Sequence, residues 1–249
     1  MSNLIKCDFR RIIKKKSFII ALLVIMFLVI ATALDQRNTN WNGYAYLYSV
    51  QSQLSIYNLV LSALIFLSVY GDEFKAMAMT IAIGRGISRS KLIIAKMIDN
   101  IILSILLFGI FAAAIVAVGI ILGANMTSEE IFALAFNIML GAYKSIGYSA
   151  IASIILFVNA NVPIGLFLLL VMHVVMPIVI GTAATSSKLL AAMHLDRWFY
   201  GGIADSGYSS ILLGMPASGI FTLVLGFVIY VGISLWITII LFSKREMDF

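Results

Sequence analysis

The sequence is poor in charged residues and cysteine, and each shortage excludes a class of protein. Charged residues make up 11% of the 249 residues and hydrophobic residues 62%, with a mean hydropathy of +1.08. A soluble domain has about 25% charged residues. A soluble fold of this length could not bury so much apolar surface, so lipid must be the solvent for much of it. The single cysteine, Cys7, excludes an internal disulfide.

The sequence also has none of the common catalytic motifs. It contains no phosphate-binding loop of the form G-x-x-x-x-G-K-(S/T), no H-E-x-x-H and no G-x-S-x-G. His173 and His194 are far apart and have few potential ligands nearby. We therefore expect no catalytic, cofactor-binding or metal site in the chain, and no motif supports a membrane-embedded enzyme. The formal charge of +6 comes from basic residues beside apolar runs, which favours a membrane over nucleic acid as the partner.

Long apolar runs dominate the sequence. A run of about 20 apolar residues crosses about 30 Å of hydrocarbon as a helix. The runs predict an all-α integral membrane protein with about six transmembrane helices, forming a single transmembrane domain over residues 1–249. The predicted spans cover residues 17–34, 54–70, 97–122, 131–158, 163–182 and 217–242. Residues 183–216 fit either a short helix on the membrane surface or a re-entrant hairpin.

The basic residues predict the orientation. Thirteen Lys and Arg lie before the first span, between the second and third spans, and in the C-terminal tail, against three on the opposite side. This bias favours a cytoplasmic location for both termini. Within residues 1–16 the apolar and basic side chains separate onto two halves of a helical wheel, which is typical of a helix in the headgroup layer. The alternative is a positive flank without defined structure.

The segment between the second and third spans, residues 72–96, carries the functional argument. Phe74, Met77, Ala78 and Ile81 recur at i, i+3, i+4 and i+7 and form one apolar face of a short helix. This pattern predicts an amphipathic helix on the cytoplasmic face, held between two spans. Methionines on such a helix suit a pliable docking surface. A membrane-surface helix without a partner is the alternative.

Two short motifs carry a resemblance to a known family. Glu73, Thr80, the run Gly86-Ile87-Ser88-Arg89 and Lys96 resemble the E…GT…P-(V/I)-S-R…K signature of ABC-2 type transporter permeases. The sequence departs from that signature at Gly86, where proline is usual, and at Met79, where glycine is usual. The tail from Phe242 to Met247 resembles the family's C-terminal F-x-K-R-D, with Glu246 in the acidic place.

The resemblance implies a transmembrane subunit of an ABC exporter in the bacterial cytoplasmic membrane. ATP and Mg would bind a separate ATPase subunit, and two identical or sister permease chains would pair as a dimer. Residues 72–96 would hold the coupling helix that docks on the ATPase. Glu73, Phe74, Met77 and Ile81 would form that contact, while Arg89 and Lys96 would anchor the next helix at the headgroups. For Arg89 a simple lipid anchor is the alternative.

The same resemblance bears on the cargo. The chain is similar to peptide-exporter and lantibiotic-immunity permeases, which implies export of an amphipathic or antimicrobial peptide or of another hydrophobic compound.

Two ionisable residues lie inside predicted spans. An unpaired lysine at mid-bilayer costs roughly 2.5–3.5 kcal/mol, so we expect Lys144 to face the protein interior, a water-filled pathway or a subunit interface. Ser145 and Ser149 belong to a row of small residues on the same helix, which permits close helix contact. His173 is either a satisfied interior histidine or part of a pathway. An ion-coupled secondary transporter using Lys144 is therefore the alternative function, and it would need clustered ionisable residues and broken helices.

Overall fold

The computed structural model describes residues 10–14, 16–35, 42–75, 83–84, 86–186 and 194–244. All regular structure in these ranges is helical, and they contain no strand. Five helices are long and apolar enough to cross a membrane, which confirms the coarse prediction of an all-helical, multi-pass membrane protein. They are Gly43–Gly71, Arg89–Ile121, Ser128–Asn159, Val162–Ala183 and Pro216–Lys244.

The first predicted span, residues 17–34, forms helix α2 (Lys16–Asp35). Within it only the shorter segment Leu22–Ala31 qualifies as an apolar helix, so α2 is not one of the five and a sixth crossing stays a prediction. Residues 10–14 form a preceding helical turn in which Ile12 is buried against the core while Arg10 and Lys14 are exposed. Ile13, on the predicted apolar half, is exposed as well. Residues 1–9 lie outside the described part of the chain, and the amphipathic interfacial helix stays a prediction.

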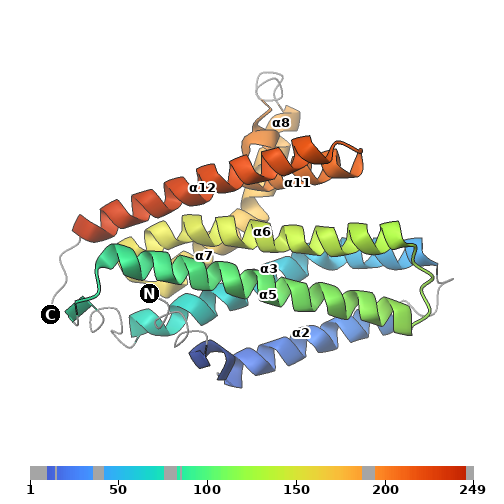
Figure 1. Ribbon diagram of the computed structural model, residues 1–249, viewed down its shortest axis with the longest axis horizontal. Helices are drawn as coiled ribbons and strands as arrows, with labels where there is room; N and C mark the ends of the chain where they lie inside the picture. The colour runs from blue at the N-terminus through green and yellow to red at the C-terminus, as the bar shows by residue number, and fades with distance from the viewer. Residues whose placement is uncertain are drawn as a thin grey trace.

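The long helices run back and forth along one axis (Figure 1). They are α3 (Gly43–Lys75), α5 (Arg89–Ile121), α6 (Ser128–Asn159) and α12 (Pro216–Lys244). At the left end of the view α3 ends, α5 begins and α12 ends. At the opposite end a capping box starts α6, in which Thr127 accepts from the Glu130 backbone N–H and Glu130 accepts from the Thr127 N–H over 2.7 Å.

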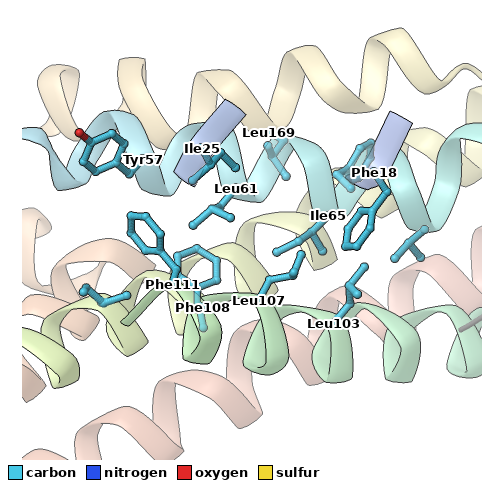
Figure 2. Close-up of a cluster of buried hydrophobic side chains, with 14 of the residues drawn as sticks. Phe18, Ile25, Tyr57, Leu61, Ile65, Leu103, Leu107, Phe108, Phe111 and Leu169 are labelled. Atoms are coloured by element: carbon cyan, nitrogen blue, oxygen red, sulfur yellow. The ribbon is translucent and has the colours of Figure 1, made fainter. Parts of the chain in front are cut away.

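The core lies between α2, α3, α5, α6 and α7 (Val162–Leu170), and its α2-facing part is lined by α3, α5 and α7. Figure 2 shows Phe18 and Ile25 from α2 facing side chains of the other three helices. The rings of Tyr57 and Phe111 meet edge to face, with their centroids 5.6 Å apart. Lipid tails are as apolar as these side chains, so close packing rather than removal from water must hold the helices together.

The fifth candidate span is not a regular helix. Helix α7 passes into a π-helical turn, η2 (Val171–Val175), and then into α8 (Met176–Ser186). Pro177 has no N–H to donate to the carbonyl of His173, four residues earlier. The N–H of Met176 instead bonds to the carbonyl of Val171, five residues back. Proline and π-helical turns are common causes of helix kinks, and α8 leaves the direction of the bundle (Figure 1).

The segment before α12 forms a hairpin with it. Helix α10 (Leu195–Trp198) is followed by α11 (Tyr200–Leu212), which packs along α12 and against α6. The Tyr230 hydroxyl donates to the Trp198 carbonyl over 2.6 Å, so the start of α11 lies beside the middle of α12. Residues 187–193 lie outside the described part of the chain, and the choice between a surface helix and a re-entrant hairpin stays a prediction. Gly207 and Gly219 allow the two helices to approach closely, because a Cβ on Gly219 would meet the Gly207 carbonyl.

Candidate functional site

A polar cavity of about 340 Å³ lies where α3, α6, the η2–α8 turn and α11 meet. Its polar lining comes from four separate parts of the sequence: Ser55, Asn58, Lys144, Tyr148, His173 and Asp205. Membrane proteins bury so few ionisable groups that a cluster of three beside one cavity marks a candidate functional site. Among the described residues, no group of three or more His, Cys, Asp and Glu could hold a metal ion.

An ion pair crosses the cavity. The Nζ of Lys144, in the middle of α6, donates to Oδ1 of Asp205 on α11 over 2.6 Å. The Lys144 side chain is 25% exposed and that of Asp205 is 64% exposed. The pairing offsets the cost of placing a lysine inside a membrane-spanning helix. The carboxylate is the more accessible partner of the pair.

His173 is hydrogen-bonded at both ring nitrogens. Its Nδ1 lies 3.1 Å from the Leu169 carbonyl, and its Nε2 lies 3.1 Å from the Ser62 hydroxyl. A carbonyl only accepts, so Nδ1 carries the hydrogen, and in the neutral ring Nε2 accepts from Ser62. The Tyr148 ring packs edge-on against the imidazole, with centroids 4.6 Å apart. The π-helical turn therefore carries a histidine that is satisfied and also lines the cavity.

Tyrosines fix α11 against α6 beside the ion pair. The Tyr200 hydroxyl donates to the Tyr143 carbonyl over 2.9 Å, and the two rings stack with centroids 4.7 Å apart. The Tyr200 ring occupies the space that a side chain at position 147 would need, so Gly147 is required for this contact. In the same way the Tyr148 hydroxyl fills the space beside Gly201.

The structure brings together only part of the predicted site. Lys144 and His173, chosen from the sequence as possible pathway residues, line the same cavity. Ser145 and Ser149 are not among its lining residues, and both are fully buried. The sequence analysis missed Asp205, for which the one available signal was an acidic residue in an otherwise uncharged stretch.

The predicted coupling segment is described in part. Glu73 and Phe74 lie in the last turn of α3, which continues to Lys75 instead of ending at residue 70. Met77 and Ile81 lie outside the described residues. The separate short helix predicted from their spacing therefore stays a prediction.

Arg89 joins the two motif regions at one end of the bundle. Its Nη1 donates to the carbonyls of Phe242 and Ser243, over 2.9 and 3.0 Å, and its guanidinium lies 5.7 Å from the centre of the Phe242 ring. The last carbonyls of a helix lack donors within it, and a cation there also favours the helix dipole. Arg89, the first residue of α5, thus caps the C-terminal end of α12 rather than only anchoring to lipid.

Lys96 differs from its prediction. We expected it at the headgroups, where its ammonium would remain in contact with water. Its side chain is instead 1% exposed, inside the first turns of α5. The spacing from Arg89 indicated a short distance from the membrane surface, but seven residues along a helix amount to two full turns, which is enough to carry Lys96 into the protein.

No protein-family model matches the chain, and no curated protein matches it. The resemblance to ABC-2 permeases therefore depends on the motifs around residues 73–96 and 242–247.

Proposed function

We propose that the chain is the transmembrane permease subunit of an ATP-driven ABC exporter, with a separate ATPase subunit docking on the segment between α3 and α5. The observation that carries the proposal is the contact of Arg89 with Phe242 and Ser243. The two short motifs behind the family resemblance are 153 residues apart in sequence, and this contact joins them. A chance match at two unrelated positions would not require them to be neighbours.

A mechanical route from the docking segment to the cavity supports the proposal. Residues 76–88 connect the end of α3 to the start of α5, so a force on them acts on both helices. Arg89 extends the connection to α12, and α12 packs along α11, which carries Asp205. ATP-driven movement of the docked subunits would in this way shift α11 relative to Lys144 on α6.

The proposed cargo is an amphipathic peptide or another hydrophobic compound. An apolar groove of about 680 Å³ runs between α11 and α12, with Ile203, Leu225, Ile229 and Ile233 in its lining. Such a groove suits apolar side chains, while the polar cavity beside Lys144 suits the polar face of the same molecule. Together they offer an amphipathic surface at the hairpin.

Retention of an ATPase tests the proposal. The tagged chain is purified from its host in a mild detergent, and co-purifying proteins are identified by mass spectrometry. We expect a soluble ATPase to be retained and to be lost when Phe74 and Met77 are both replaced by Asp, because charge at an apolar contact opposes docking. Asn125→Asp adds a charge at an exposed position at the opposite end of the bundle and should leave retention unchanged.

Two outcomes would count against the exporter. The first is the absence of any ATPase under conditions that preserve other membrane complexes. The second is an ATPase that is retained equally well by the Phe74→Asp/Met77→Asp variant and by the Asn125→Asp variant.

An ion-coupled secondary transporter is the second candidate, and one observation favours it. Lys144, Asp205 and His173 line one cavity beside a helix that is broken at the π-helical turn, and such transporters bind their coupling ion at broken helices. Vesicles containing the purified chain alone distinguish the two. Uptake or efflux driven by an ion gradient without ATP, and abolished by Lys144→Met, would favour this candidate over the exporter.

A further inference from the structure

A set of buried polar atoms between α5 and α6 has no hydrogen-bond partner in the described protein. Asn100 and Ser104 on α5, and Ser145 and Ser149 on α6, are all 0% exposed. Both amide atoms of Asn100 and all three serine hydroxyls lack a partner, as does Oδ1 of Asn58 on α3. The next serine along α6 has a partner: Ser153 donates to the Ala150 carbonyl over 2.7 Å. The unpartnered groups are therefore concentrated in one region.

The packing of α5 on α6 aligns these groups. The Phe108 ring and the Asn58 amide both occupy the space that a Cβ on Gly141 would need, so residues 108 and 141 are at the same level. The two helices are antiparallel and adjacent (Figure 1). Moving toward the start of α5 is the same direction as moving toward the end of α6. One turn in that direction places Ser104 level with Ser145, and a second turn places Asn100 level with Ser149. Positions spaced by four residues share a face, so both rows face the α5–α6 contact.

Leaving these groups without partners would be costly. An amide or hydroxyl moved into an apolar environment without a hydrogen bond costs roughly 1–3 kcal/mol by mutational measures. Buried water is the usual way in which such groups are satisfied, and each buried water makes two to four hydrogen bonds. The amide of Asn100 offers two donors and an acceptor, and each serine hydroxyl offers a donor and an acceptor. The aligned groups supply this pattern over two turns.

We propose that the α5–α6 contact is a hydrated seam: a file of water molecules bound by Asn100, Ser104, Ser145 and Ser149. Asn58 is the link to the cavity, because it lines the cavity beside Lys144 and lies against Gly141, one turn from Ser145. The seam runs from there toward the end of the bundle where Arg89 caps α12. It gives the Lys144–Asp205 pair water access from that end, and it does so independently of whether the protein is an exporter.

Cysteine reactivity tests the seam. Single cysteines replace Ser104, Ser145 or Ser149 in a Cys7→Ser background, and Ala150→Cys is the matched control. Ala150 is also 0% exposed and is adjacent to Ser149, but it packs among Met97, Ile146 and Val231. Methyl methanethiosulfonate is small, crosses membranes and reacts with the thiolate. Blocked thiols in membranes are quantified by labelling the remaining thiols with a maleimide-polyethylene glycol after denaturation.

We expect the three seam cysteines to be blocked at least about tenfold faster than Ala150→Cys, because a dry, apolar site that raises a thiol pKa by one unit lowers its thiolate fraction about tenfold. Equal rates at Ser149→Cys and Ala150→Cys, whether slow or fast, would overturn the proposal. If an α6 variant does not fold, Ser104→Cys still reports on the seam, because Ser104 lies on α5, and its rate is compared with that of Ala150→Cys. Size-exclusion profiles matching the parent chain establish that each variant is folded.

Discussion

The Nζ of Lys144 donates to Oδ1 of Asp205 over 2.6 Å, and this ion pair joins the middle of a core helix to the hairpin helix α11. The two residues are 61 positions apart in the sequence. Helix α6 packs against α3, α5, α7 and α12, whereas α11 packs mainly against α12 and reaches α6 through tyrosines. The ion pair is therefore a specific tether that holds α11 next to the cavity.

Replacing Lys144 by Met should destabilise the protein by roughly 1–2 kcal/mol. Exposed ion pairs contribute about 0.2–1 kcal/mol, while breaking a fully buried pair costs about 3–5 kcal/mol, and this pair is intermediate in exposure. The measurement is equilibrium unfolding in detergent micelles. The double variant Lys144→Met/Asp205→Leu removes both charges and should recover part of the loss. Equal unfolding free energies for the single and double variants would mean that the unpaired Asp205 carries no penalty.

The apolar runs predicted most of the long helices because crossing a bilayer requires about 20 apolar residues in a row. They underestimated α3, which extends over Gly43–Lys75 instead of residues 54–70. The missed N-terminal part contains Ser49, Gln51, Ser52 and Gln53, which lower the local hydropathy. Ser49 is buried and Ser52 donates to the Ser49 carbonyl, so contacts inside the protein and within the helix accommodate polar residues that a hydropathy pattern treats as a loop.

The sequence predicted one member of the ion pair at the candidate site but not the other. Lys144 could be identified because an unpaired lysine in a span has a high free-energy cost. That cost does not indicate where in the sequence its partner lies. Asp205 belongs to α11, whose sequence YGGIADSGYSSIL is rich in glycine and serine and has low intrinsic helix propensity. Packing of Gly207 against α12 and of Tyr200 against Gly147 holds this helix in place. Such tertiary contacts do not appear in a local pattern.

Replacing Arg89 by Ala should loosen the end of α12. The change removes two hydrogen bonds from a charged group to the Phe242 and Ser243 carbonyls, and we expect a loss of about 1–2 kcal/mol. Trypsin cleavage after Lys244 under native conditions measures this fraying and should become faster. Arg89→Lys should have an intermediate effect, because an ammonium lacks the guanidinium's planar fork of donors.

The control for Arg89 is Lys91→Ala, which removes a cation from an exposed position in the same first turn of α5. It should leave the cleavage rate unchanged. If the Lys91 and Arg89 variants are cleaved equally fast, general loss of positive charge at this end explains the effect, and the specific cap does not.

Gly147→Ala should lower stability, whereas Gly109→Ala should not. A Cβ at position 147 would collide with the Tyr200 ring, whereas nothing lies within 4 Å of a Cβ at position 109. Overpacking costs about 1–3 kcal/mol, so Gly147→Ala should lower the melting temperature. Alanine in a helix interior is favoured over glycine by roughly 0.5–1 kcal/mol, so Gly109→Ala should be neutral or stabilising. Equal melting temperatures for the two variants would place Tyr200 elsewhere than against α6.

Pro177→Ala should convert the π-helical turn into a regular α-helix. Alanine supplies the N–H that Pro177 lacks, so the His173 carbonyl gains a donor and the π turn can close as a regular α-helical turn. A π turn holds one residue more than an α turn, so this conversion rotates α8 about its axis by about 100°. On a helix about 10 Å wide, that rotation moves an exposed side chain by several Å. Spin labels at the exposed Val179 on α8 and Val228 on α12 measure this shift by electron–electron double resonance. Met176→Ala, which retains its N–H, should leave the distance unchanged. An unaltered distance in Pro177→Ala would show that the hydrogen bond of His173 with Ser62, rather than the proline, holds the turn.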